Sequence, residues 1–239
     1  MPAILFGFQY TGEQVLPGAV ADVTNWQAFY QSRGITTTCI DDVTKPMQCS
    51  KLAVMQLLYK EAVESHDRGS GHLYVHFSGH GLHRQDDSGD ELDGRDEGIL
   101  LPEGTVLWDD EIYRWLDSIG KNTRVTLVVD TCYSGTIADQ KYQHGAYLMH
   151  NASNRRPRPS NRAPVVTFAS SGDSQTASEM VLDGQVQGAF SYAMIKVLED
   201  NLHVDGLVDR VNAILRSKGL TQRACMHTNG LGHVKLFVA

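Results

Sequence analysis

Two kinds of apolar pattern alternate along the chain. Short runs of consecutive apolar and β-branched residues, such as Val125–Val129, are typical of strands buried on both faces of a parallel sheet. Longer segments with apolar residues three or four positions apart, as at Val20, Val23, Trp26 and Tyr30, are typical of helices that bury one face. These patterns predict strands at residues 3–8, 35–40, 73–75, 125–129, 164–170 and 235–238, and helices at residues 17–33, 51–65, 109–120, 189–198 and 205–215.

The alternation of strands and helices predicts a single α/β domain. Each strand–helix–strand unit forms a right-handed crossover, and successive crossovers build a parallel sheet with helices packed against it. The 239 residues are enough for one domain with a substantial core. One segment, which contains prolines and basic residues, interrupts the pattern. We therefore divide the domain into residues 1–139, a mobile basic loop at 140–163, and residues 164–239.

Composition narrows the class of protein. The net charge of −7 argues against a nucleic-acid partner and against an anionic membrane surface. No apolar stretch is long enough to span a bilayer, so no membrane partner is expected. The four cysteines include no C-x-x-C pair, so they indicate neither a disulfide scaffold nor a zinc ribbon. This cysteine usage fits a reducing compartment, and we expect a cytoplasmic protein.

Two short turns carry the candidate chemistry. His76–Gly81 follows one predicted strand, and Asp130–Gly135 follows another. In an open α/β sheet the loops at the carboxyl ends of the strands form the active crevice, so neighbouring strands would bring His80 and Cys132 together. An imidazole beside a thiol is the minimum apparatus for a cysteine nucleophile. We expect the amides of Gly81 and Cys132 to converge on a carbonyl oxygen as an oxyanion hole.

The two turns also resemble the motifs of a known family. Ser-Gly-His-Gly at 78–81 and Asp-Thr-Cys-Tyr-Ser-Gly at 130–135, with His and Cys 52 residues apart, resemble the catalytic motifs of the metacaspases, which are caspase-like cysteine peptidases. The resemblance implies a monomer with a caspase-like three-layer sandwich, in which a mostly parallel six-stranded sheet has helices on both faces. It also implies a cysteine endopeptidase in which Cys132 attacks the scissile carbonyl and His80 transfers protons. No third catalytic residue is evident.

Polar residues beside the catalytic pair match the substrate pocket of that family. Asp130 and Ser78 each precede a catalytic residue by two positions, so each borders the same crevice. Asp22 lies in an element that resembles the family's Gly-Cys-x-Asn-Asp motif, with Ala19 in place of the cysteine. The resemblance implies protein or peptide substrates that are cleaved after Arg or Lys, with Ser170 in the far wall of the groove. The alternative is that both acids are ordinary loop or cap residues.

An acidic, turn-rich segment lies between residues 86 and 97. It does not match the EF-hand calcium loop, and a solvated loop is the ordinary explanation of such a run. The metacaspase resemblance instead implies calcium, which prefers carboxylate, carbonyl and water oxygens, and a site that would order the active-site loops. For the two adjacent aspartates at 109 and 110, helix capping is the alternative. The calcium candidates are Asp96, Asp109, Asp110 and Asp139.

The basic residues of the loop at 140–163 are candidate sites of self-cleavage. An exposed loop with arginines is a good substrate for an enzyme that cleaves after Arg or Lys, so we predict self-cleavage into two fragments that stay associated. A merely solvated linker is the alternative, and the absence of interleaved aromatic residues argues against nucleic-acid binding. The candidate cleavage residues are Lys141, Arg155, Arg156, Arg158 and Arg162.

Three other functions stay open at this point. The histidines at 72, 76, 80 and 83 are a candidate zinc site, but they lie along a predicted strand without the Glu of an H-E-x-x-H motif, so packed or edge histidines are the better interpretation. The chain could be a catalytically weak scaffold that binds partners. It could also be a cysteine hydrolase that acts on another acyl substrate.

Overall fold

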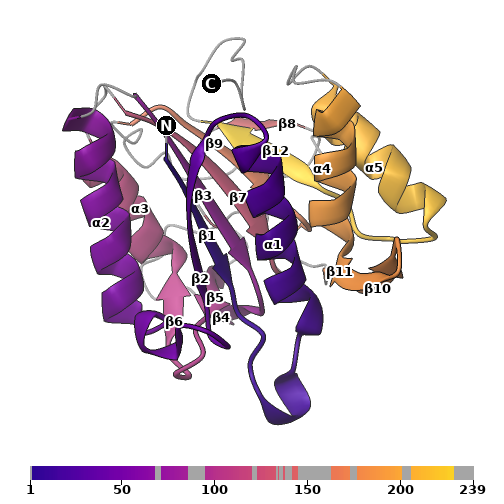
Figure 1. The fold of residues 1–239 in the computed structure, drawn as a ribbon, viewed down its shortest axis with the longest axis horizontal. Helices are drawn as coiled ribbons and strands as arrows, with labels where there is room; N and C mark the ends of the chain where they lie inside the picture. The colour runs from indigo at the N-terminus through magenta and orange to yellow at the C-terminus, as the bar shows by residue number, and fades with distance from the viewer. Residues whose placement is uncertain are drawn as a thin grey trace.

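The structure, a computed structural model, shows three layers with a sheet in the middle (Figure 1). It describes residues 2–67, 71–85, 95–119, 123–132, 134, 137, 142–144, 163–172, 177–200 and 206–228. Two groups of buried apolar side chains, one on each face of the sheet, form the core. Alternate residues of β1 show this division, because Ile4 and Phe6 belong to one group and Ala3 and Leu5 to the other.

The described part of the central sheet has seven strands. All pairs from β2 to β9 are parallel, whereas β12 is antiparallel to β9 and β8 is antiparallel to β12. The predicted apolar runs form the buried central strands, and this confirms the mostly parallel sheet. The strand order is β2 (Thr36–Asp41), β1 (Pro2–Gly7), β3 (His72–Ser78), β7 (Arg124–Asp130), β9 (Val165–Ala169), β12 (Cys225–Thr228) and β8 (Tyr142–His144).

Helices cover both faces of this sheet. On one face, α2 (Lys51–Asp67) and α3 (Asp109–Ser118) pack on the group that contains Phe6 and Phe77. On the other face lie α1 (Pro17–Gln31), α4 (Ala189–Asp200) and α5 (Leu207–Ser217) (Figure 1). All five predicted helices are present, with ends shifted by at most two residues. No described helix is both long and apolar enough to cross a membrane.

Two smaller β-structures were not predicted. β4 (Gly81–Gln85), β5 (Arg95–Leu100) and β6 (Val106–Trp108) form an antiparallel sheet that starts directly after His80. β10 (Glu179–Leu182) and β11 (Gln185–Gly188) form a hairpin. Its two turn residues, Asp183 and Gly184, have φ angles of 51° and 82°, as a type I′ turn requires. The chain also contains the short 3₁₀ helices η1 (Gly12–Gln14) and η2 (Pro46–Gln48).

Some predicted boundaries differ from the structure. The expected strand at 235–238 lies outside the described residues, and β12 is the strand that pairs antiparallel with β9. Residues 142–144, which we expected within the loop, form the edge strand β8. Ala163, at the end of the expected loop, is buried, and residues 140, 141 and 145–162 lie outside the described residues. The N-cap of α3 is Trp108, so Asp109 and Asp110 are the first helical residues rather than its cap.

Candidate active site

The register of the sheet brings the two reactive residues to one edge. β3 and β7 are adjacent and parallel, with Ser78 opposite Asp130, and His80 and Cys132 each follow two residues later. The amide of Gly79 donates to the carbonyl of Asp130 at 3.3 Å, which continues the pairing beyond the strands. A Cβ on Gly81 would overlap the carbonyl oxygen of Cys132, so only glycine permits this approach. The two turns therefore lie against each other at the carboxyl end of the sheet.

Two neighbours fix the position of His80. Its Nε2 lies 2.8 Å from the carbonyl oxygen of Gln14 in η1. A carbonyl can only accept, so Nε2 carries the proton and Nδ1 is left as the basic nitrogen. The amide of His80 donates to the hydroxyl of Tyr10 at 2.9 Å, and that hydroxyl donates to the carbonyl of Leu100 at 2.7 Å. The Tyr10 and His80 rings also contact each other, with centroids 4.7 Å apart.

This orienting group could not be predicted from sequence, because any residue can present a main-chain carbonyl. The main-chain carbonyl of Gln14 orients the His80 ring, and no sequence motif marks this position. Tyr10 has a positive φ of 59°, which is uncommon for a residue other than glycine, and its amide donates to the Asp42 carboxylate at 2.7 Å. The segment that carries Tyr10 and Gln14 is therefore held in an unusual conformation beside the histidine.

The thiol of Cys132 is half-buried and lies beside the loop that precedes β10. Its Sγ accepts a hydrogen bond from the Ala177 amide at 3.3 Å. Burial raises the pKa of the thiol, and the nearby Asp130 raises it further, although the Ala177 amide opposes both effects. A thiol in this state stays protonated at neutral pH. It needs a base such as His80 before it can attack a carbonyl.

Two buried carboxylates lie behind this turn. Asp22 accepts hydrogen bonds from the Ser78 hydroxyl at 2.7 Å and from the Gly188 amide at 2.9 Å. Asp130 accepts from the Ser191 amide at 3.0 Å. A Cβ on Gly188 would overlap the Asp130 carboxylate and would lie 2.6 Å from Asp22 Oδ2, so both carboxylates adjoin this glycine. The three predicted pocket residues Asp22, Ser78 and Asp130 are thus brought together.

Among the described residues, no cationic side chain balances the charge of this pair. Burial raises the pKa of both carboxyls, and the negative charge of Asp130 raises the pKa of Asp22 further. Hydrogen bonds from Ser78, Gly188, Ser191 and Ser170 oppose these shifts. In the part of the chain that the structure describes, neither carboxylate forms an ion pair with Lys or Arg. The pair is therefore an uncompensated acidic site beside the nucleophile.

A third acid, Glu179, was missed by the sequence analysis. It lies opposite Gly188 in the β10–β11 hairpin, and the amides of Gly18 and Ala19 at the start of α1 donate to its carboxylate. A Cβ on Gly18 would lie 2.6 Å from Glu179 Oε1. Burial and the charge of Asp130 raise the pKa of Glu179. The only sequence feature that could have indicated the hairpin carrying Glu179 is the Asp-Gly pair of its turn.

Ser170 is placed differently from our expectation. Its side chain is fully buried, and its hydroxyl donates to the carbonyl of Thr131 at 2.8 Å. The hydroxyl of Ser171 donates to the same carbonyl at 3.2 Å. Ser170 therefore contacts the turn that carries Cys132 and lies within hydrogen-bonding distance of the Asp130 carboxylate, and its buried side chain does not line an open groove.

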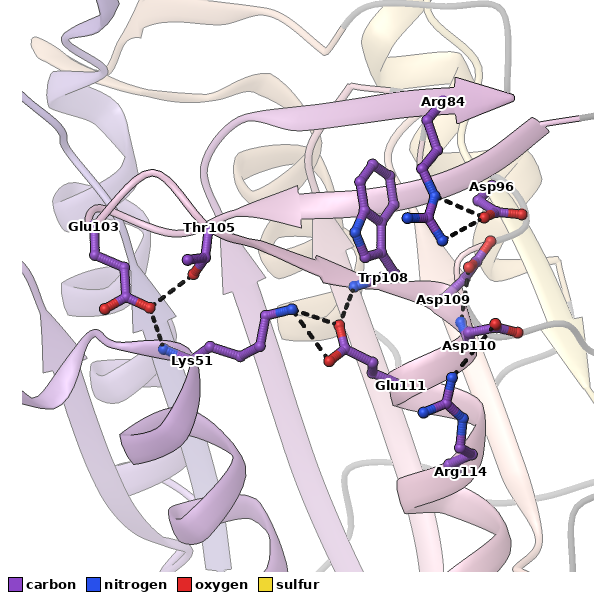
Figure 2. Close-up of polar contacts among 10 residues, drawn as sticks. All are labelled: Lys51, Arg84, Asp96, Glu103, Thr105, Trp108, Asp109, Asp110, Glu111 and Arg114. Atoms are coloured by element: carbon purple, nitrogen blue, oxygen red, sulfur yellow. Dashed lines mark hydrogen bonds and ion pairs between the residues drawn. The ribbon is translucent and has the colours of Figure 1, made fainter. Parts of the chain in front are cut away.

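Three of the four calcium candidates, Asp96, Asp109 and Asp110, lie at the small sheet and the start of α3 (Figure 2). Arg84 forms an ion pair with Asp96, and Arg114 forms one with Asp110. Asp109 accepts from the amides of Glu97 and Asp110. Among the described residues, no group of three or more His, Cys, Asp or Glu side chains is arranged to hold a metal ion. Asp139 lies outside those residues, so the four-residue calcium site stays a prediction.

Two further predictions concerned the histidines of β3 and the self-cleavage residues of the basic loop. The histidines of β3 are buried, with His72 bonded to Thr126 at 2.8 Å and His76 to Tyr30 at 2.6 Å. They are packed side chains, as expected. The predicted cleavage residues lie outside the described part of the chain, so self-cleavage stays a prediction; these residues are Lys141, Arg155, Arg156, Arg158 and Arg162.

Comparisons with known proteins agree with this geometry. Metacaspase-1B of Aspergillus oryzae is 28% identical over 82% of this chain and 60% of its own length. Metacaspase-1B of Neosartorya fischeri is 27% identical over 95% of this chain and 69% of its own length. The chain thus spans about 60 to 70% of the length of these relatives.

Solved structures share the fold. Protein GSU0716 from Geobacter sulfurreducens has a TM-score of 0.70 at 20% identity, and it covers 99% of this chain and 98% of its own. Caspase-1 from Spodoptera frugiperda has a TM-score of 0.66 at 13% identity, with 99% of this chain and 88% of its own covered. The expected caspase-like fold is confirmed. The Caspase domain family matches residues 2–234, almost the whole length, and the chain belongs to this family of cysteine peptidases.

Proposed function

We propose that this chain is a cysteine endopeptidase that cleaves peptide bonds after Arg or Lys. The observation that carries the proposal is a pair of buried carboxylates, Asp22 and Asp130, which have no cationic partner among the described residues. Asp130 precedes Cys132 by two residues, and Asp22 contacts Ser78 on the neighbouring strand. Asp22 is 2% exposed and Asp130 is 6% exposed. A guanidinium or ammonium group of a substrate supplies the positive charge that such a site lacks.

The catalytic steps follow from the residues at the sheet edge. His80 Nδ1 accepts the proton of Cys132 Sγ, while Nε2–H stays bonded to the Gln14 carbonyl. The thiolate attacks the carbonyl carbon, and the amides of Gly81 and Cys132 stabilise the oxyanion. The imidazolium then donates its proton to the leaving amine. The same nitrogen deprotonates water, which cleaves the thioester and restores the thiol.

Binding of the cationic side chain is coupled to proton release. Raised carboxyl pKa values mean that the empty pocket retains protons to a higher pH than free carboxyls do. An arginine side chain favours the ionised carboxylates, so its binding strengthens as pH rises through their raised pKa values. Glu179, which lies within electrostatic reach of Asp22 and Asp130, adds a third negative charge when it is ionised.

Calcium stimulation and self-cleavage are part of the same proposal. Asp96, Asp109 and Asp110, together with Asp139, would supply carboxylate oxygens, which are the ligands that calcium prefers. Calcium bound there would order the loops around the active site. The enzyme would cleave its own basic loop, because that loop contains the Arg and Lys residues after which it cuts.

Matched fluorogenic peptides that end in Arg, Lys or Asp test the proposal, each assayed with calcium and with a chelator. We expect hydrolysis after Arg and Lys, little after Asp, and none by the Cys132→Ala variant. Preference for Asp would overturn the pocket assignment. Full turnover by Cys132→Ala would overturn the nucleophile, and equal rates with calcium and chelator would remove calcium stimulation.

A further inference from the structure

The segment that joins β1 to α1 contacts both the ring and the amide of His80, and it lies beyond the carboxyl end of β1 (Figure 1). Tyr10, at the start of this segment, accepts the His80 amide, and Gln14 presents its carbonyl to Nε2. Tyr10 is buried, whereas residues 11–15 are exposed. The position of the Gln14 carbonyl on this exposed part therefore depends on how the base of the segment is held.

The side chain of Asp42 holds that base. Asp42 directly follows β2, whose last residue Asp41 lies opposite Gly7, the last residue of β1. Its Oδ1 accepts the Gln9 amide at 2.7 Å, and its Oδ2 accepts the Tyr10 amide at 2.7 Å. One carboxylate therefore binds two successive main-chain donors at the point where the chain leaves the sheet. Hydrogen bonds to a carboxylate are stronger than those between neutral groups, so this attachment is firm.

Gln9 is held from two sides. Its amide is bound by Asp42, and its carbonyl oxygen accepts the Leu16 amide at 2.7 Å. The second bond brings the two ends of the segment together, as in other compact loops. Gln14 lies inside the closed loop, two residues before Leu16. A displacement of Gln9 would therefore carry the Gln14 carbonyl with it.

Tyr10 adopts a backbone conformation that needs such support. Its φ of 59° lies in the left-handed region, which is unfavourable for a residue with a Cβ. The bond from its amide to Asp42 favours this conformation. With the main chain turned in this way, the Tyr10 hydroxyl meets the His80 amide at 2.9 Å and the Leu100 carbonyl at 2.7 Å. Asp42 thus supports each of the two contacts that the segment makes to His80.

We propose that Asp42 is a positioning residue for catalysis, which acts on His80 through the segment at residues 9–16. Asp42 fixes the segment, and the Gln14 carbonyl on that segment fixes the proton of the imidazole on Nε2. Nδ1 is then free to accept the proton of Cys132. The inference rests on the proposed role of His80 as the base, and it adds a residue that lies outside both catalytic motifs.

The tautomer of His80 is the direct readout, because a residue that only stabilises the fold would not change it. Long-range proton–nitrogen spectra of the histidine rings distinguish a proton on Nε2 from one on Nδ1, and the His80 signals are those missing from His80→Gln. All proteins carry Cys132→Ala, so that no self-cleavage occurs. We expect the proton on Nε2 in the parent and both tautomers in Asp42→Ala. Asp42→Asn, which keeps one oxygen acceptor, should lie between them.

Asn212 provides a matched control for the stability of the fold. Its Oδ1 accepts the Ala224 amide at 2.8 Å, and its Nδ2 donates to the Ala224 carbonyl at 2.9 Å. Like Asp42, it attaches two segments through a pair of side-chain to main-chain bonds. It lies on α5, which packs on the face of the sheet opposite to the core group that contains Tyr10. Asn212→Ala should lower the unfolding temperature and leave the His80 tautomer unchanged.

Kinetics of the proteins that retain Cys132 give a second readout. Asp42→Ala should lower kcat toward arginine peptides about 10- to 100-fold and keep KM within about threefold, since other residues hold the pocket acids Asp22 and Asp130. A kcat loss no larger than that of Asn212→Ala would overturn the inference.

The tautomer measurement separates this inference from the proposed function. An unchanged His80 tautomer in Asp42→Ala would overturn the positioning role, whatever the activity of the parent; if Asp42→Ala does not fold, Asp42→Asn decides. If the parent does not cleave arginine peptides, a changed tautomer in the Asp42 variants still supports the positioning role, and only the proposed function fails.

Discussion

Replacing Asp22 with asparagine tests the acidic pocket most directly. Asparagine has the same shape and can keep both hydrogen bonds, because its oxygen can accept from the Gly188 amide and its amide group can donate to the Ser78 oxygen. The substitution thus removes the charge and leaves the local geometry. Losing one partner of a buried charge pair costs about 2–5 kcal/mol. Because asparagine still bonds to its neighbours, we expect the lower end, about 2–3 kcal/mol, which is roughly a 30- to 160-fold loss of kcat/KM for arginine peptides.

The same substitution should not weaken the fold at neutral pH. Burial and the charge of Asp130 raise the pKa of Asp22 in the folded protein, so the folded state holds this proton more tightly than the unfolded chain does. The stability from this group is present at low pH and is lost as pH rises through the raised pKa. Asparagine does not ionise. The variant should therefore unfold at an equal or higher temperature than the parent at neutral pH, and the difference should shrink as pH falls.

The assay combines arginine-peptide kinetics with thermal unfolding across a pH series. Asp41→Asn is a suitable control, because Asp41 is also buried and accepts bonds from the amides of Val43 and Thr44 but is not part of the pocket. It should lose about 1–2 kcal/mol of stability and keep kcat/KM within about threefold. The reasoning is refuted if Asp22→Asn keeps its activity toward arginine peptides, or if it is destabilised at neutral pH.

Three other changes probe the rest of the site. Gly81→Ala should lower kcat at least about 100-fold, since its Cβ would overlap the Cys132 carbonyl and separate the catalytic turns; steady-state kinetics on folded protein checks this. Tyr10→Phe should destabilise the protein by about 1–3 kcal/mol in denaturant titrations, because His80 N–H and the Leu100 carbonyl lose their partner. Unchanged stability would contradict that role. Replacing the basic loop residues with glutamine should abolish the fragments seen on a gel, and unchanged fragments would end the self-cleavage prediction; these residues are Lys141, Arg155, Arg156, Arg158 and Arg162.

The parts of the fold that could be predicted are those with a strong local pattern. β3 and β7 contain the short runs Leu73–Val75 and Val125–Val129 and are followed by glycine-containing turns, and this pattern specified both the strands and the edge that carries His80 and Cys132. Asp22 could not be assigned from its pattern, because it lies within α1 between apolar positions. Only the family resemblance brought it into the pocket.

The parts that could not be predicted depend on contacts between distant segments. β4, β5 and β6 are short, and their polar residues include Arg84 and Asp96, so they have no apolar periodicity of their own. The pairing of β4 with β5 and of β5 with β6 can be recognised only in the folded structure. The orienting carbonyl of Gln14 has no residue signature at all. Sequence patterns therefore located the reactive atoms but not the groups that orient them.

Asp96 and the Asp22–Asp130 pair are buried acidic groups with different partners, and this difference supports the proposed specificity. Asp96 has its own guanidinium, that of Arg84, held by two bonds and the Trp108 indole. Among the described residues, Asp22 and Asp130 have only neutral donors, and burial raises the pKa values of both. Under the proposed specificity, the basic side chain of the substrate supplies the cation that this pair lacks, whereas the Asp96 carboxylate is already paired with Arg84.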